Sequence, residues 1–173
     1  MSLRFKLPKN IKGRGSALRF GIEQSRGDIV VFFPSDDEYS PDNIIDLVQA
    51  IQTQNVNAVF GSRSIKCLNL EERIKRIYQG NKFDYLISKF GGMSLSIISL
   101  LLYNRYVTDP LSGLKAFNRR LLDKLELRAK GVELEAEIIS KLSLQNEFIM
   151  DLPVEHYPRL KSDGKKITVF DGL

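Results

Sequence analysis

Three acidic residues stand together two positions after an apolar run, in a pattern that could bind a divalent cation. Asp36, Asp37 and Glu38 follow residues 29–33, which carry no polar side chain. Carboxylate oxygens on a short loop are the hard ligands that Mg²⁺ and Mn²⁺ prefer in proteins. The alternative is an acidic turn exposed to water, in which Asp37 alone could be a cap residue. The spacing favours the metal site.

The apolar run predicts the element that positions these acids. Residues 29–33 are β-branched or aromatic without polar alternation, which is typical of a strand buried on both faces of a largely parallel sheet. Ligands of such sheets bind outside the carboxyl ends of the strands, so the acids lie where chemistry is expected. Ser40 as N-cap and Pro41 as first helical residue then predict a helix over residues 42–52.

A second predicted strand, residues 58–60, ends just before Arg63. Strand, helix and strand form a βαβ unit, and its right-handed crossover would bring Arg63 to the same sheet edge as Asp36 and Glu38. A guanidinium at that edge can hold a phosphate through two parallel hydrogen bonds. An ordinary surface arginine is the alternative.

A basic loop with two glycines, residues 8–15, precedes a helix predicted over residues 16–25. Glycine beside a helix N-terminus lets backbone N–H groups approach a phosphate, and Lys12 would add positive charge. The loop matches neither a Walker motif nor a dinucleotide-binding fingerprint, so a solvated turn is equally compatible with it.

Composition limits the classes of protein and partner. A chain of 173 residues with 43% hydrophobic residues fits one domain with one sizeable core. The net charge of +5 indicates anionic partners, but basic and aromatic residues do not interleave as they do in nucleic-acid-binding modules. We therefore expect no nucleic acid partner. The single cysteine, Cys67, excludes an internal disulfide and is typical of a reducing, cytoplasmic setting.

The middle of the chain is charged and helical over residues 68–90 and then apolar. Its uncharged part, residues 93–103, is shorter than the roughly 20 residues that cross a bilayer, so we expect no membrane span. One helical face there predicts core packing, with a membrane-resting or partner-binding surface as the alternative. That face contains Leu86, Phe90, Met93, Ile97 and Leu101.

The last third begins with a turn around Asp109 that leads into a short strand ending near Phe117. Helices are predicted over residues 118–125 and 131–145, and strand-like segments over residues 148–152 and 154–157. Acids open the second of these helices and suit the positive end of its dipole; they are Glu133, Glu135 and Glu137. The only histidine, His156, is expected to be structural.

Taken in order, the motifs resemble those of the family-2 glycosyltransferases, especially the branch that loads sugars onto polyprenyl or dolichyl phosphate. The segments that carry the resemblance are NIKGRG, FFPSDDEYSPD, VFGSR, TDPLSGLKAF and PRLKSDGKK. The resemblance implies a GT-A-like, Rossmann-like α/β fold, with a mostly parallel sheet flanked by helices. It also implies a single glycosyltransferase domain over residues 4–173, with residues 1–3 as an added start.

The resemblance assigns roles residue by residue. Asp36 matches the second aspartate of the family's DxD segment, whose first aspartate is replaced by Pro34. Glu38 matches a further metal ligand of the prenyl-phosphate branch, and the pair implies Mg²⁺ or Mn²⁺. Asp109 matches an acid that acts near the acceptor, and Asp37 is a second candidate for the catalytic base. The implied contacts to substrate phosphates are Arg63, Arg159 and Lys166, with Lys12 added from the basic loop.

The implied reaction is inverting, metal-assisted hexosyl transfer from a nucleotide sugar to a polyprenyl phosphate or a glycan. It implies peripheral contact with the inner, cytoplasmic face of a membrane. Family members normally begin with two strand–helix units that hold base and ribose, and no such units precede Arg4. We therefore expect an N-terminally truncated domain that is inactive alone and self-associates through its exposed sheet edge. The alternative is a non-catalytic remnant that binds or scaffolds at an anionic surface.

Overall fold

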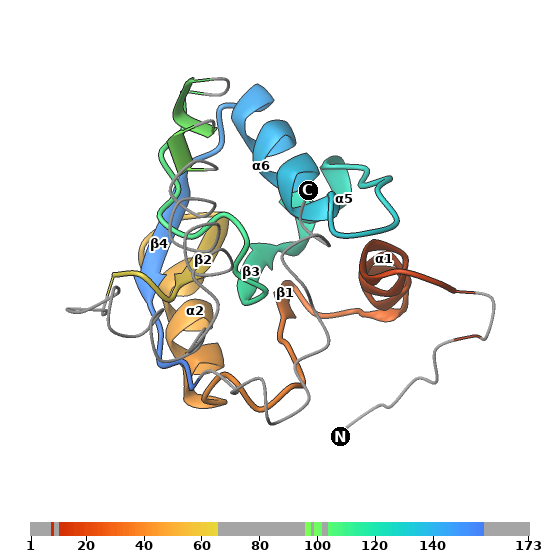
Figure 1. The fold of residues 1–173 in the computed structure, drawn as a ribbon, viewed down its shortest axis with the longest axis horizontal. Helices are drawn as coiled ribbons and strands as arrows, with labels where there is room; N and C mark the ends of the chain where they lie inside the picture. The colour runs from red at the N-terminus through yellow and green to blue at the C-terminus, as the bar shows by residue number, and fades with distance from the viewer. Residues whose placement is uncertain (1–7, 9–10, 66–95, 98, 102–103, 158–173) are drawn as a thin grey trace, which may run out of the picture.

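The computed structural model describes residues 8, 11–65, 96–97, 99–101 and 104–157 of the chain. Four described strands form one sheet in the order β1-β3-β2-β4. The strands are β1 (Ile29–Phe32), β2 (Ala58–Ser62), β3 (Lys115–Asn118) and β4 (Ile149–Pro153). The described helices include α1 (Arg14–Gln24), α2 (Asp42–Thr53), α5 (Arg119–Lys124) and α6 (Leu134–Leu144), as Figure 1 shows.

Strand direction makes the described sheet mixed rather than mostly parallel: three of its four strands run the same way, and the fourth runs opposite between two of them. β2 pairs parallel with β4, and β3 pairs antiparallel with both β1 and β2. Strands β1, β2 and β4 therefore run the same way, and the predicted unit β1–α2–β2 is present. β3 lies between its two strands: Phe117 is the register partner of Val30 on one side and of Ala58 on the other.

Helices cover both faces of the sheet, with α2 on one face and α1, α5 and α6 on the other (Figure 1). Alternation along β2 divides its side chains between the layers: Phe60 packs in the cluster with α6, and Val59 in the cluster with α2. The Phe60 and Phe117 rings meet edge to face at 6.0 Å. Burying each such side chain stabilises the fold by roughly 1.5–3 kcal/mol.

The strand that is buried on both faces is β2, whereas β1 alternates. All five residues of β2 are buried, while in β1 only Val30 and Phe32 are. Within the described residues β1 lies at the end of the sheet with β3 as its neighbour, and Ile29 and Val31 are only partly buried, against the layer that contains α2. The expectation that β1 is buried on both faces was therefore wrong.

Close backbone contact explains the two glycines at the start of α1. A Cβ at Gly13 would lie 2.4 Å from the carbonyl oxygen of Lys130, and one at Gly15 would lie 2.5 Å from that of Ala129. Gly13 also has a φ of 86°, in the region that favours glycine. These glycines let the 129–130 backbone pack against α1.

Exposure of the segment near residue 100 contradicts the predicted core packing for two residues. Ile97 is 46% exposed and Leu101 is 77% exposed, whereas Ser96 and Ser99 are buried. The helix predicted over residues 68–90, with Leu86 and Phe90, lies outside the described residues, and so does Met93. In the part of the chain that the structure describes, no helix is long and apolar enough to cross a membrane.

Candidate functional site

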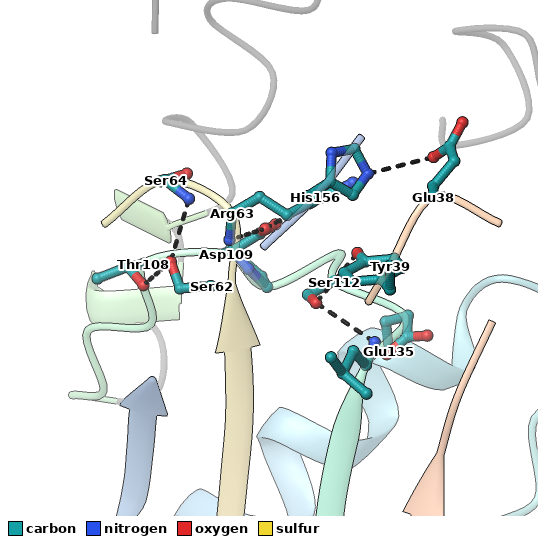
Figure 2. Close-up of polar contacts among 12 residues, drawn as sticks. Glu38, Tyr39, Ser62, Arg63, Ser64, Thr108, Asp109, Ser112, Glu135 and His156 are labelled. Atoms are coloured by element: carbon teal, nitrogen blue, oxygen red, sulfur yellow. Dashed lines mark hydrogen bonds and ion pairs between the residues drawn. The ribbon is translucent and has the colours of Figure 1, made fainter. Parts of the chain in front are cut away.

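Strand direction gathers four loops at one edge of the sheet. The loops after β1, β2 and β4 leave from the carboxyl ends of these parallel strands. Because β3 runs the opposite way, the turn before it reaches the same edge. Figure 2 shows side chains from all four loops above the strand ends, among them Glu38, Arg63, Asp109 and His156.

Arg63 and Asp109 form the central contact of this edge. Oδ2 of Asp109 accepts hydrogen bonds from the backbone N–H of Arg63 at 3.1 Å and from its Nε at 2.5 Å. Oδ1 of Asp109 accepts from Nη2 of Arg63 at 2.7 Å. The Arg63 side chain is 32% exposed, and that of Asp109 is 8% exposed. The carboxylate is therefore buried beside an arginine side chain that is partly exposed to solvent.

Mutual attraction keeps both partners charged. Burial alone would lower the pKa of Arg63, but the adjacent Asp109 carboxylate outweighs it and raises that pKa. Burial would raise the pKa of Asp109, but the charge and hydrogen bonds of Arg63 hold it below its usual range. A carboxylate with a lowered pKa is a weak base. The geometry suits Asp109 to orienting Arg63.

The acidic loop contacts the segment after β4. The backbone N–H of Glu38 donates to Oδ1 of Asp36 at 3.3 Å, and Oε2 of Glu38 lies 3.2 Å from Nε2 of His156. The His156 ring packs edge to face on Tyr39 at 4.8 Å. Asp37 is exposed and has a φ of 61°, a left-handed conformation that aspartate tolerates. His156 thus belongs to the site, where it contacts a predicted metal ligand.

The donor set at Asp36 and Glu38 fits a hard divalent cation in part. Within the described ranges, no group of three histidine, cysteine or acidic residues is placed to hold a metal ion. Two carboxylates would leave most of an octahedral shell to water and phosphate oxygens, which is how Mg²⁺ is commonly held. Such an ion would bind mainly together with an anionic ligand.

Buried hydroxyl groups support the turn that carries Asp109. Oγ1 of Thr108 donates to Oγ of Ser62 at 2.7 Å, and the backbone N–H of Thr108 donates to Oδ2 of Asp151 at 2.7 Å. The Tyr39 hydroxyl lies 3.5 Å from Oγ of Ser112, and burial raises the pKa of Tyr39. Burial also raises the pKa of Asp151. The turn is thus tied to both β2 and β4.

The basic loop and the first turn of α1 bind other segments of the same chain. The backbone N–H of Ser16, in the first turn of α1, donates to the carbonyl of Lys130 at 3.0 Å. Arg14 forms an ion pair with Glu135, Nη2 to Oε1, at 2.8 Å. Lys12 is exposed. The predicted phosphate contacts Arg159 and Lys166 lie outside the described residues.

Two residues of the site region were not singled out from the sequence. Lys115 is fully buried at the start of β3, and Glu135, predicted only as a helix-dipole acid, is buried against it. A signal was present for Lys115, because a lysine inside the apolar segment LKAF must pair with an acid if that segment is a buried strand. Its partner, 20 residues later, had no local signal.

Comparison with known proteins adds sequence relatives. The family model described as Glycosyl transferase family 2 matches residues 4–112. The chain is 35% identical over 151 residues to the UDP-N-acetylglucosamine–dolichyl-phosphate N-acetylglucosaminyltransferase of Methanococcus voltae, covering 83% of this chain and 55% of that protein. It is 30% identical over 154 residues to the dolichol-phosphate mannosyltransferase of Pyrococcus furiosus, covering 89% and 40%. The chain thus spans about half the length of these relatives.

Solved structures share the fold. Glucosyl-3-phosphoglycerate synthase from Mycobacterium tuberculosis, in complex with UDP, superposes with a TM-score of 0.57 at 24% identity, over 88% of this chain and 49% of that one. Its complex with Mn²⁺, UDP and glucosyl-3-phosphoglycerate gives a TM-score of 0.53 at 24% identity, over 90% and 50%. This likeness confirms the predicted GT-A-like α/β fold.

Proposed function

Because the chain belongs to glycosyl transferase family 2, we propose that its protein moves a hexosyl group from a nucleotide sugar to a polyprenyl or dolichyl phosphate. Both relatives described above are named for dolichyl phosphate. In the proposed step, the bond from the anomeric carbon to the donor diphosphate breaks and a bond to an acceptor phosphate oxygen forms, with inversion. The nucleoside diphosphate leaves with the electron pair of the broken bond.

The observation that carries the proposal is the fixed position of the Arg63 guanidinium, held by Asp109 at the sheet edge that also carries Asp36 and Glu38. Glu38 is close enough to contribute to the raised pKa of Arg63. A preorganised cation stabilises charge as it develops on a leaving or attacking phosphate, without reorganisation during the reaction. Phosphate recognition by Arg63 is therefore the chemistry that this edge supports best.

We assign the divalent cation, Mg²⁺ or Mn²⁺, to Asp36 and Glu38. When bound, the ion would neutralise charge on the departing diphosphate. The contact between His156 and Glu38 would orient that carboxylate. Further phosphate contacts are proposed for Lys12, Arg159 and Lys166.

The state of Asp109 supports an acceptor that is already anionic. A prenyl phosphate needs no proton removed before it attacks, whereas a sugar hydroxyl needs a base. The lowered pKa of Asp109 makes it poor in that role, so for a glycan acceptor the base would be Asp37. A lipid acceptor implies peripheral contact with the cytoplasmic face of a membrane, and exposed Ile97 and Leu101 suit such a contact.

The test is release of nucleoside diphosphate by the complete protein from a panel of nucleotide sugars. We expect turnover with dolichyl phosphate and a divalent cation, little with dolichol lacking the phosphate, and little after chelation by EDTA. Turnover with hydroxyl acceptors alone would overturn the lipid-phosphate assignment. Absence of both donor binding and turnover with any acceptor would favour the non-catalytic alternative.

The same assay addresses domain organisation. We propose that residues 4–173 form part of one glycosyltransferase domain, because relatives about twice as long align with most of the chain. Donor binding draws on contacts to base and ribose as well as to diphosphate. The 173-residue chain alone should transfer little sugar and should self-associate, which light scattering would detect; efficient turnover by a monomer would contradict both expectations.

A further inference from the structure

Lys115 is a charged side chain with no exposure to solvent. It is the first residue of β3, its exposed fraction is 0%, and its Nζ lies 2.5 Å from Oε2 of Glu135. The same ammonium lies 4.6 Å from the centroid of the Phe60 ring. A buried ammonium is costly unless every donor finds a partner. Its remaining contacts therefore indicate what it does.

Those remaining contacts are backbone carbonyls of the turn that carries Asp109. Nζ of Lys115 donates to the carbonyl oxygens of Ser112 and, at 3.4 Å, of Pro110. The turn closes on itself through a hydrogen bond from the Ser112 N–H to the Asp109 carbonyl at 3.1 Å. Arg63 thus holds one end of the turn through Asp109, and Lys115 holds the other.

Glu135 fixes the ammonium and connects it to a second cation. Its Oε2 contacts Lys115, and its Oε1 lies 2.8 Å from Nη2 of Arg14. Glu135 stands in the first turn of α6 and Arg14 at the start of α1, so one carboxylate connects two helices to β3. The ammonium is therefore fixed by α6 as well as by the turn.

We propose that Lys115, oriented by Glu135, is a positioning residue for transfer: it holds the 109–113 turn so that Asp109 presents Arg63 to the acceptor phosphate. The kinetic part of this inference rests on the proposed function. The structural part, control of the turn by the buried ammonium, does not.

A purely structural role for the pair is the competing explanation, and a double variant separates the two. Lys115→Met/Glu135→Met removes both buried charges, and such apolar replacements often leave a protein as stable as before. The Pro110 and Ser112 carbonyls nevertheless lose their donor. A structural role predicts normal behaviour of this variant, whereas positioning predicts a loosened turn in a stable protein.

Amide hydrogen exchange of the 173-residue chain tests the structural part. In Lys115→Met/Glu135→Met we expect the Ser112 and Leu114 amides to exchange at least about tenfold faster, while amides of α2 keep their rates. Glu135→Gln keeps an oxygen acceptor for Lys115 and should give an intermediate effect. Leu142→Ala, a buried change in α6 away from the turn, should speed exchange without selecting these two amides. Wild-type exchange in the double variant would overturn the proposal.

Kinetics of the complete protein test the remaining part. We expect the double variant to raise KM for dolichyl phosphate about tenfold while changing KM for the nucleotide sugar less than threefold. Equal loss for both substrates, or wild-type kinetics, would overturn positioning. If the wild-type protein transfers no sugar, the proposed function fails, and the exchange experiment still decides whether Lys115 controls the turn.

Discussion

Two ion pairs lie at the same edge of the sheet and differ in their access to solvent. The Arg63 side chain is partly exposed beside buried Asp109, whereas Lys115 and Glu135 are both enclosed. The partner raises the pKa of Arg63, but burial lowers the pKa of Lys115 despite its partner. The comparison shows that solvent access decides whether an ion pair can contact a ligand or only other parts of the protein. The Arg63 side chain can be reached from solvent, while the contacts of Lys115 with described residues are all within the protein.

The largest expected effect is on stability, at the enclosed pair. Lys115→Ala would leave Glu135 buried with only Arg14 as its ionic partner, and breaking such a pair costs about 3–5 kcal/mol. Urea unfolding of the 173-residue chain measures this cost. Lys124→Ala, an exposed lysine of α5, is the matched control and should change stability by less than about 0.5 kcal/mol. A loss of stability below about 1 kcal/mol for Lys115→Ala would contradict the prediction that the enclosed pair is the more important one for stability.

The partly exposed pair of Arg63 and Asp109 should matter more for sugar transfer than the enclosed pair of Lys115 and Glu135. Arg63→Ala should lower kcat/KM by about 10²–10³-fold, as loss of one preorganised donor does, because a charge facing the phosphate is lost. Since the Arg63 side chain is partly exposed, the stability cost should be smaller than the cost of about 3–5 kcal/mol expected for a fully enclosed pair. Arg63→Lys keeps the charge without the planar fork and should fall between. Undiminished transfer by Arg63→Ala would remove this residue from the phosphate site.

The two pairs should also respond at opposite ends of the pH scale. Because the pKa of Asp109 is lowered, its contribution is fully present above the unfolded value near 3.9 and is lost as pH falls through the folded value. The stability difference between wild type and Asp109→Asn should therefore be constant above about pH 5 and shrink in acid. Chemical denaturation from pH 8 to pH 3 measures it; an unchanged difference at pH 3 would contradict the prediction.

Lys115 gives the alkaline counterpart. Its lowered pKa means that the folded chain releases the ammonium proton at a lower pH than the unfolded chain. Between the folded value and the unfolded value near 10.4, the unfolded state binds more protons, so stability rises with pH. The free energy of unfolding of wild type should rise relative to that of Lys115→Met as pH approaches 10, which chemical denaturation measures. A stability difference that falls or stays constant would contradict the prediction.

The smallest effect is expected for metal alone. With two carboxylate ligands, Mn²⁺ without nucleotide should raise Tm by less than about 1 °C, and a nucleoside diphosphate should enlarge the shift. Asp36→Ala should abolish the enlarged shift, whereas Asp37→Ala is the matched control for removing one charge from the same loop. Thermal unfolding with Mn²⁺ and UDP compares the three proteins. Identical shifts in wild type and Asp36→Ala would remove Asp36 from the site.

Local patterns were sufficient to predict the first half of the described fold. The apolar run of β1, the helical spacing of α2 and the short strand β2 each follow from neighbouring residues, and together they predicted Arg63 and Asp36 at one edge. The end at which chemistry is expected follows from strand direction. This much of the site required no long-range information.

Contacts between distant segments could not be predicted in the same way. Arg63 was interpreted as a phosphate contact and Asp109 as a catalytic acid, because nothing local shows that they bind each other across 46 residues. The position of β3 between β1 and β2 depends on pairing with residues far away in the chain. Glu135 looked like an ordinary helix-dipole acid, since its burial is decided by β3.

The place of β3 also has a consequence for how the chain folds. β1 and β2 are close in sequence, but the strand that joins them, through pairs such as Val30 with Phe117, is synthesised much later. Contacts of large sequence separation slow folding, because the entropy of closing the loop is lost before the contacts form. During synthesis the edges of β1 and β2 that pair with β3 would therefore stay without hydrogen-bond partners until β3 has been made. Mispairing with other chains in that interval is the hazard that a chaperone would have to prevent.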